Sequence, residues 1–367
     1  MKVKAFFKRE PVLCISAACA ILSMIFVPPN STYADYIDFK VLAMLFCLMA
    51  VVAGAQRCLL FDKLAQKLLE LCSGMRLLRL VLVLLPFFTS MLITNDVALI
   101  TFVPFAISVL ALVGRQKDLI PVVVLQTVAA NLGSMATPVG NPQSLFLYNH
   151  FQLPITDYFA WLLPLVGVSL AALVVCALAG KNHPVSVELE WQVKLEHPKL
   201  LAMHGVLFVL CLLSVLHLLD YRLVLLVVVL ALFIFDRSLF KHVDYCLLLT
   251  FVCFFIFSGN LGSIPVVRDF LGGLMADHAL VTSVAASQVV SNVPAAVLLA
   301  GFCQDAKALL IGTNVGGLGT IIASLASLIS FKFYLRAEGA KPLAYLGWFT
   351  VANLAGLVLF LGVTAVL

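Results

Sequence analysis

The chain has 367 residues, of which 63% are hydrophobic and only 11% are charged, and its formal net charge is +5. This composition lies far outside the range of soluble globular proteins. Apolar runs of about twenty residues recur along the whole length, without the two-residue alternation of a transmembrane barrel. The sequence therefore predicts an all-α polytopic membrane protein.

The apolar runs divide the chain into five segments. We expect an N-terminal transmembrane helix and loop at 1–35, a first inverted repeat at 36–180, a cytoplasmic linker at 181–199, scaffold helices at 200–242 and a second inverted repeat at 243–367. Helices are predicted at 12–28, 36–56, 155–179, 200–219, 222–236, 243–258 and 342–366, interfacial amphipathic segments at 59–72 and 264–277, and pairs of apolar arms at 77–93 with 97–113 and at 279–290 with 295–304. Basic residues precede the first run as in a signal peptide, but no small-residue cleavage site follows, so we expect a retained helix.

A polar phrase occurs twice inside otherwise apolar stretches. Its aligned members are Asn131 with Asn314, Gly133 with Gly316, and Thr137 with Thr320. Glycine and asparagine are poor helix formers, and non-helical backbone at membrane depth is tolerated only where it is buried in protein or lines a watery cavity. Two matched interruptions indicate two discontinuous transmembrane helices, at 119–150 and 306–331, as in secondary transporters with a structural repeat. The second copy lacks the prolines of the first, so we expect its interruption to be less open.

The distribution of positive charge predicts the orientation of the chain. With the N-terminus in the cytoplasm, 19 of the 23 Lys and Arg residues fall in cytoplasmic segments, which is a strong positive-inside signal. The number of crossings between the matched helix starts Ile37 and Val243 is odd, whether the arm pairs span the membrane or turn back within it. The second repeat is therefore expected to be inverted. The net charge reports orientation, and no nucleic-acid-binding patch is predicted.

Polar residues gather at the turns between the apolar arms and at the two interruptions. Hydroxyl and amide oxygens beside the freed carbonyls of a broken helix are ligands suited to Na⁺, and half-helix N-termini suit a carboxylate or oxyanion. The alternative is that these residues only satisfy turn backbone, but matched positions in both halves favour a site. The candidate substrate-binding residues are Thr94, Asn95, Asp96, Asn131, Gly133, Thr137, Pro138, Asn141, Ser291, Asn292, Thr313, Asn314, Gly316 and Thr320, and Asn95 and Asn292 are also candidate Na⁺ ligands.

Asp96 is the most informative single candidate. A carboxylate flanked by apolar arms is costly at membrane depth unless it is paired, protonated or bound to a cation. We therefore expect Asp96 to couple a proton or a cation to transport. The alternative is a solvated turn residue that caps the next arm. Val293 occupies the matching position in the second half, so the two tips are not expected to be equivalent.

The phrases resemble those of a known family. Residues 94–96 followed by an apolar arm, and then 131–142, are similar to the ion transporter superfamily, which includes divalent-anion/sodium symporters, citrate permeases, arsenite-efflux permeases and some sodium/proton antiporters. Residues 291–292 and 312–328 resemble its second half. The resemblance covers nearly the whole chain from about residue 36. It implies two re-entrant hairpins, a homodimer, and an elevator-like movement of a transport domain against a scaffold.

The tips of the two arm pairs depart from one branch of this superfamily. In the anion/sodium symporters each tip carries a Ser-Asn-Thr triplet that binds sodium and substrate, whereas Asp96 and Val293 stand at the third positions here. Asn followed by Asp is closer to the arsenite and antiporter branches. The resemblance is therefore specific for the superfamily and weak for the branch.

Together these observations predict a secondary active transporter that moves a small anion, foremost a carboxylate such as citrate or a dicarboxylate, coupled to Na⁺ or H⁺. A Na⁺/H⁺ antiporter and an arsenite-type efflux permease are the alternatives. A membrane enzyme is disfavoured because Asp96 is the only strong intramembrane carboxylate, and a channel because paired broken helices suit alternating access. The expected partners are a small inorganic or carboxylate anion, the lipid bilayer and a second copy of the chain, without cofactor or nucleic acid. The expected location is the cell inner (plasma) membrane, with a cytoplasmic N-terminus.

Overall fold

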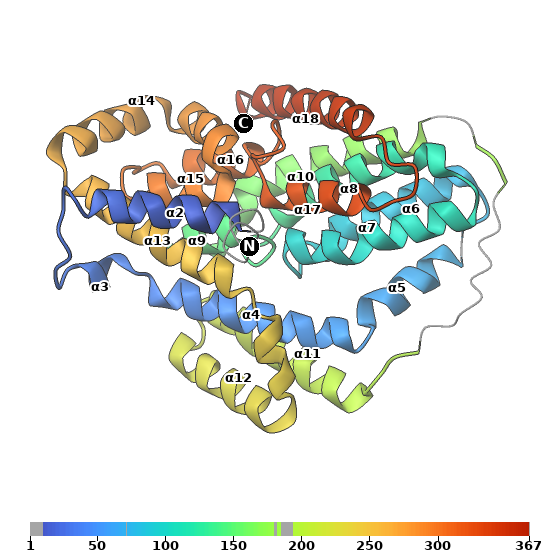
Figure 1. Ribbon diagram of the computed structural model, residues 1–367, viewed down its shortest axis with the longest axis horizontal. Coiled ribbons are helices and arrows are strands. Elements are labelled where there is room, and N and C mark those ends of the chain that lie inside the picture. The colour runs from blue at the N-terminus through green and yellow to red at the C-terminus, as the bar shows by residue number, and fades with distance from the viewer. Residues whose placement is uncertain (1–9, 71, 180–181, 185–193, 367) are drawn as a thin grey trace, which may run out of the picture.

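The computed structural model describes residues 10–70, 72–179, 182–184 and 194–366. Most of its helices run along the longest axis of the molecule (Figure 1). Within these ranges no strand occurs, and strand-like pairing is limited to one bridge between Gly74 and Pro184. Seven of the described helices are long and apolar enough to cross a membrane. The predicted all-α polytopic membrane class is confirmed.

The described residues up to Leu178 form nine α-helices and one 3₁₀ helix. They are α2 (Pro11–Ser23), α3 (Tyr33–Tyr36), α4 (Phe39–Arg57), α5 (Leu60–Leu69), α6 (Met75–Thr89), α7 (Asn95–Leu112), η1 (Gln116–Asp118), α8 (Leu119–Ser134), α9 (Pro142–His150) and α10 (Ile155–Leu178). The predicted interruption of the helix at 119–150 is present, because α8 and α9 are separated by residues 135–141.

The second half repeats much of this order. It contains α11 (Pro198–Val215), α12 (Tyr221–Phe235), η2 (Arg237–His242), α13 (Tyr245–Gly262), α14 (Pro265–Val290), α15 (Asn292–Ala300), α16 (Ala306–Val315), α17 (Leu325–Tyr334) and α18 (Pro342–Thr364). Residues 316–324 separate α16 from α17. The starts of α4 and α13 are also matched, because Asp38 accepts a hydrogen bond from the Val41 amide at 3.0 Å and Asp244 accepts one from the Leu247 amide at 2.9 Å.

Two predictions about individual segments are wrong in detail. The first helix ends at Ser23 rather than at residue 28, and the chain continues in turns to Val27, where the following proline disfavours helix. By contrast, the predicted division between the segment at 264–277 and the arm at 279–290 is present as a kink at His278, where the backbone of α14 leaves the helical conformation. The second interruption was expected to be the less open one, yet it is longer than the first.

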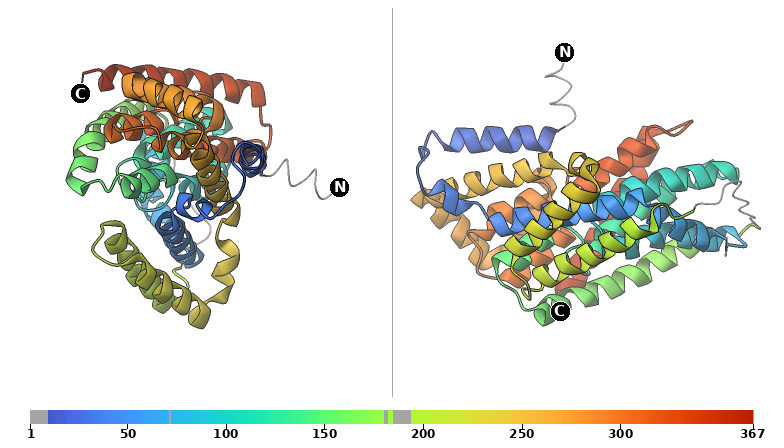
Figure 2. Two further views of the ribbon diagram at one scale, coloured as in Figure 1. Left: turned by 90° about the vertical axis from the view of Figure 1, so that its left-hand side faces the viewer. Right: turned by 90° about the horizontal axis from the view of Figure 1, so that it is seen from below.

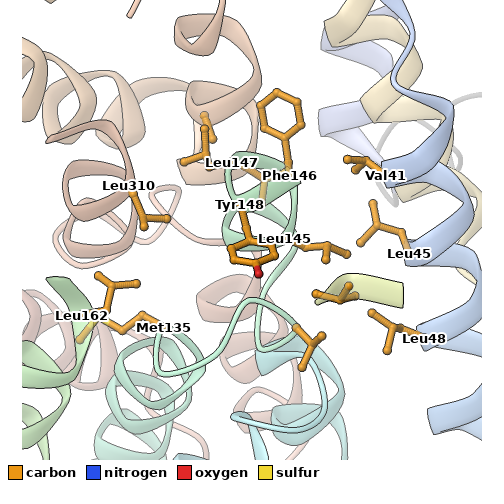
Figure 3. Packing of buried hydrophobic residues seen from close by; sticks show 14 of the residues in the cluster. Val41, Leu45, Leu48, Met135, Leu145, Phe146, Leu147, Tyr148, Leu162 and Leu310 are labelled. Carbon is orange, nitrogen blue, oxygen red and sulfur yellow. The ribbon is translucent and has the colours of Figure 1, made fainter. Parts of the chain in front are cut away.

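The helices form two groups around a shared apolar core. Helices α4, α11 and α12 lie at the bottom of Figure 1, and in the left view of Figure 2 α4 lies between α12 and the remaining helices. Side chains of α4, among them Val41 and Leu45, point toward Leu145 and Phe146 of α9 in the same buried cluster (Figure 3). We refer to α4, α11 and α12 as the lower layer. The two arm pairs and the broken helices lie above it.

Candidate functional site

Two arm pairs approach the centre of the molecule from opposite ends. The first hairpin consists of α6 and α7 and lies toward the right of Figure 1, whereas the second hairpin consists of α14 and α15 and lies toward the left. Each hairpin packs against the broken helix of its own half, α6 and α7 against α8, and α14 and α15 against α16. We call residues 135–141 the first break and residues 316–324 the second break.

The tip of each hairpin is attached to the break of its own half by the same backbone hydrogen bond. The amide of Asn95 donates to the carbonyl oxygen of Gly140 at 3.1 Å, and the amide of Asn292 donates to that of Ala323 at 2.9 Å. Both asparagine side chains also accept a hydrogen bond from the amide of the next residue at 3.0 Å. The structure thus places the two predicted tip asparagines in equivalent surroundings, and both are buried.

Thr137 and Thr320 attach each break to its hairpin by a second hydrogen bond. The hydroxyl of Thr137 donates to the carbonyl oxygen of Met91, and the hydroxyl of Thr320 donates to that of Gln288 at 3.1 Å. Both acceptors belong to the hairpin of the same half. These two candidate residues therefore hold non-helical backbone in place, since a break inside a membrane protein must satisfy its polar groups internally.

Gln288 is a functional candidate that sequence reasoning missed. Its Nε2 donates to the carbonyl oxygens of Gly316 and Leu318 at 2.8 and 2.9 Å, and its Oε1 accepts a hydrogen bond from the Thr320 amide at 2.8 Å. One side chain of α14 thus satisfies three backbone groups of the second break. The sequence gives no signal for this role, because no glutamine stands at the matching place in the first half.

Gly133 and Gly316 are needed because another element approaches their backbones closely. A methyl group on Gly133 would lie 2.2 Å from the carbonyl oxygen of Phe87 in α6, and one on Gly316 would lie 2.8 Å from the side chain of Ser287 in α14. Contacts this short are not compatible with a Cβ atom at the present separation of the helices. Both candidate glycines therefore set how closely hairpin and broken helix can pack.

Asn131 and Asn314 join the two broken helices to each other. Asn131 Oδ1 accepts hydrogen bonds from Asn95 Nδ2 at 3.0 Å and from Ser324 Oγ at 3.1 Å. Asn314 Oδ1 accepts a hydrogen bond from Asn141 Nδ2 at 3.0 Å, and Asn314 Nδ2 donates to Ser144 Oγ at 3.0 Å. Asn131 thus contacts Ser324 of the second break, whereas Asn314 contacts Asn141 of the first break and Ser144 of α9. The candidates Asn95, Asn131, Asn141 and Asn314 are brought into one buried cluster, which also includes serines that were not among the candidates.

The remaining candidates are less directly involved. Ser291 has a positive φ of 76° and lies at the tip of the second hairpin, where its hydroxyl donates to Ala323 O at 3.4 Å. The Thr313 hydroxyl bonds Leu309 O of its own helix at 2.8 Å, which satisfies it locally. Pro138 is buried within the first break. By contrast Gln143, in the first turn of α9, has a buried Oε1 atom without a hydrogen-bond partner, and such an atom is costly to leave unpaired.

Asp96 and Thr94 are the candidates that face open space. Asp96 lines two neighbouring cavities of about 450 and 420 Å³, and Thr94 lines the larger one. The larger cavity lies between α4 of the lower layer and α7, and Asp244 lines both cavities from the start of α13. Asp96 is partly buried, and no ion pair involves it in the described part of the chain. The carboxylate is thus positioned to meet a ligand or an ion that enters either cavity.

Positive charge lies at the margins of these cavities rather than in the asparagine cluster. Arg57 lines the larger cavity, and Lys332 and Arg336 line the smaller one. The cluster itself offers only amides, hydroxyls and backbone groups. Among the described residues, no group of three or more His, Cys, Asp or Glu side chains is arranged to hold a metal ion. The arrangement can bind a small polar solute, and it can accommodate a cation beside Asp96.

Comparison with known proteins places this architecture among membrane transporters. The family model described as "Citrate transporter" (CitMHS) matches residues 5–327. An uncharacterized transporter of Methanocaldococcus jannaschii is 29% identical over 336 residues, which cover 90% of each chain. The inner membrane protein YbiR of Escherichia coli is 31% identical over 324 residues, 84% of this chain and 83% of YbiR. The silicon efflux transporter LSI3 of Oryza sativa is 27% identical over 187 residues, 48% of this chain and 38% of LSI3.

Proposed function

Because the chain belongs to the citrate transporter family of membrane transporters, we propose that it is a secondary active transporter of a small anion, foremost a carboxylate such as citrate or a dicarboxylate, coupled to Na⁺ or H⁺. One observation carries this proposal. Asp96 stands on the hairpin tip that is attached to the first break, and it faces both large cavities. A solute that reaches the buried asparagines through these cavities must pass this carboxylate.

The charge of the site supports coupling to a cation. An anion that leaves water needs compensating charge, because burying an unpaired charge is very costly. The asparagine cluster contains no Lys or Arg, and the carboxylates that line the cavities have the wrong sign to balance an anion. We infer that the coupling ion supplies the missing positive charge, with Asn95, Asn292 and Asp96 as its contacts. A co-bound Na⁺ or a proton on Asp96 would each meet this requirement.

A second candidate function is efflux of an uncharged weak acid. The same neutral cluster suits a small molecule whose hydroxyl groups donate to carboxylate and amide oxygens and which needs no counter-ion. The name of the rice relative, a silicon efflux transporter, and the expected arsenite-type alternative both fit such a solute. In this case Asp96 would serve proton coupling alone. A Na⁺/H⁺ antiporter would need neither solute.

Transport by the purified protein in proteoliposomes tests these alternatives. Labelled citrate and dicarboxylates are offered under an imposed Na⁺ gradient, an imposed proton gradient, or neither, and protein-free liposomes serve as the control. We expect accumulation of a carboxylate that depends on one of the two gradients. Gradient-dependent movement of an uncharged acid without carboxylate uptake would support the second candidate. Exchange of Na⁺ for H⁺ that needs no solute would overturn both.

We also propose that the protein is a homodimer in the cell inner (plasma) membrane, with a cytoplasmic N-terminus. The charge distribution and the odd number of crossings support a topology with the two termini on opposite sides. Single cysteines introduced at Lys2 and at Leu367 test this orientation with a reagent that does not cross the membrane. Labelling of both positions from the same side would contradict it.

A further inference from the structure

A separate cavity lies inside the lower layer, where its three helices meet at one end. It has a volume of about 180 Å³, and the residues that line it include Arg57 at the end of α4, Leu200 and His204 of α11, and Asp236 directly after α12. None of its lining residues belongs to the asparagine cluster. A cavity of this size has room for a small polar group together with water.

His204 brings a buried and unpaired polar atom to this cavity. The residue is only 1% exposed, and its Nδ1 atom has no hydrogen-bond partner among the described residues. Close packing holds the ring in place, because a methyl group on Gly54 of α4 would lie 2.3 Å from its Cε1 atom. A buried polar atom is costly to leave unpaired. The Nδ1 atom of His204 therefore indicates an occupant of the cavity that forms a hydrogen bond with it.

The start of α11 lies at the same cavity. The residue before the helix, His197, makes no capping hydrogen bond with its side chain, and the first turn contains no acidic residue. Pro198 has no amide hydrogen, and the amides of Lys199 and Leu200 have no acceptor within the helix. Such a helix N-terminus carries a partial positive charge that attracts anions. Because His197 and Leu200 both line the cavity, this end of α11 favours a negatively charged occupant.

Arg57 adds a full positive charge at the cavity. Its Nη1 atom donates to the two carboxylate oxygens of Asp236 at 2.9 and 3.0 Å. Asp236 also accepts hydrogen bonds from the amide and the hydroxyl of Ser238 at 3.2 and 2.6 Å. The carboxylate that lines the cavity is thus already compensated. A guanidinium has five N–H donors, and those on Nε and Nη2 of Arg57 are not used by these contacts.

We propose that this cavity binds a phosphate group, which belongs either to a membrane lipid or to a free small molecule. A phosphate group offers several strong acceptor oxygens, and the donors come from three places: the His204 ring, the Arg57 guanidinium and the start of α11. On the proposed orientation this end of the lower layer faces the cytoplasm, at the level where lipid headgroups are expected. The site is additional to the proposed transport site and does not depend on it.

Two substitutions test the site independently. His204→Phe keeps an aromatic ring beside Gly54 and removes both ring nitrogens, and His204 lines neither cavity at Asp96. Because this change also removes an unpaired buried atom, we expect an equal or higher melting temperature in the absence of phosphate. Arg57→Gln removes the charge of a side chain that is 54% exposed, and it carries the same test if the buried substitution destabilises the protein. Arg268→Gln is the matched control, since Arg268 also pairs with a carboxylate but lies on α14.

Melting temperatures are measured in an uncharged detergent with inorganic phosphate, with a short-chain phosphatidylglycerol, or with chloride at matched ionic strength. We expect phosphate, the lipid or both to raise the melting temperature of the unmodified protein and of Arg268→Gln in a saturable way. The apparent affinity should fall roughly ten-fold or more in His204→Phe and in Arg57→Gln, as expected for the loss of a hydrogen bond to a charged group. The probe that raises the melting temperature identifies the source of the phosphate group.

Asn95→Ala separates this site from the proposed transport site. The rise in melting temperature should persist in Asn95→Ala, because Asn95 does not line the cavity in the lower layer. A rise that is lost in Asn95→Ala and kept in His204→Phe would assign the anion to the transport site and overturn the proposal. No rise with either probe, or an equal rise in His204→Phe and the unmodified protein, would also overturn it. The measurement uses no gradient and no transport, so its outcome is independent of the proposed transport activity.

Discussion

The first and the second hairpin are attached to their breaks by the same set of hydrogen bonds, which we call the frame. The side chains at their tips differ. In both halves a tip asparagine amide binds a break carbonyl, a break threonine binds the hairpin, and an aligned asparagine contacts the other half. In the first half the tip adds Asp96, which faces both large cavities, whereas Val293 occupies that position in the second and is buried. The frame therefore positions two similar polar tips, and charge-dependent chemistry is confined to one of them.

The largest effect is expected at the close approach of the first half. Gly133→Ala places a methyl group 2.2 Å from a backbone oxygen that cannot move aside alone, and overpacking of this kind costs about 3 kcal/mol or more. Gly316→Ala meets the carbonyl oxygen of Gly312 at 2.6 Å and the Ser287 side chain at 2.8 Å, and it should cost less because both separations are longer than 2.2 Å. Thermal unfolding followed by size-exclusion chromatography compares the two. Gly167→Ala is the control, because no atom lies within 4 Å of the added methyl group. Equal stability of Gly133→Ala and Gly167→Ala would show that the close approach of Gly133 to Phe87 does not limit how α6 and α8 pack.

The tip asparagines should affect transport more than stability. Asn95→Ala and Asn292→Ala each remove a carboxamide that faces the breaks, and we expect gradient-driven transport to fall roughly 100-fold, with little change in expression or melting temperature. Initial rates in proteoliposomes measure this. Asn149→Ala is a matched control, since its carboxamide bonds only Leu145 O in its own helix. A normal rate in both tip variants would mean that these asparagines serve only the turns.

Loss of the Gln288 side chain should lower the stability of the second half alone. Gln288→Leu leaves two carbonyl oxygens and one amide of the second break without their partner, which should cost about 2 kcal/mol of folding stability. Gln152→Leu is the control, because the Gln152 side chain bonds one carbonyl at the end of α9, outside both breaks. Melting temperatures of the two variants provide the comparison. If both fall equally, the second break is held by other contacts.

The break threonines should give the smallest and most symmetric effect. Thr137→Val and Thr320→Val each remove one hydrogen bond between a break and its hairpin and preserve the shape of the side chain. We expect a loss of about 1 kcal/mol in each, measured by thermal unfolding in the same detergent. Thr364→Val, at the C-terminal end of α18, controls for the substitution itself. A clearly larger loss for one threonine would show that the two frames are not equivalent.

The sequence predicted the repeated features well and the unrepeated ones poorly. Asn131 and Asn314 could be found because glycine and asparagine in register inside apolar runs are rare, and the structure brings both into one cluster. Ser144 and Ser327 follow the two asparagines at the same offset and carry the same signal, although they were not chosen as candidates. Gln288 could not be found, because its role depends on how α14 is rotated against the second break. The contact between Lys40 and His217 joins residues 177 positions apart, and no local pattern encodes it.

The central claim is that Asp96 gives the first tip its coupling function, and Asp96→Asn tests it most directly. Asparagine keeps the size and hydrogen-bonding shape of the side chain and removes its charge. In proteoliposomes, we expect this variant to retain exchange of substrate across the membrane while losing accumulation driven by Na⁺ or H⁺, with a flattened pH profile. Asp244→Asn, which alters the other carboxylate of the same cavities, should keep coupling. Asp96→Asn protein with an unchanged rate and unchanged pH dependence would contradict the account.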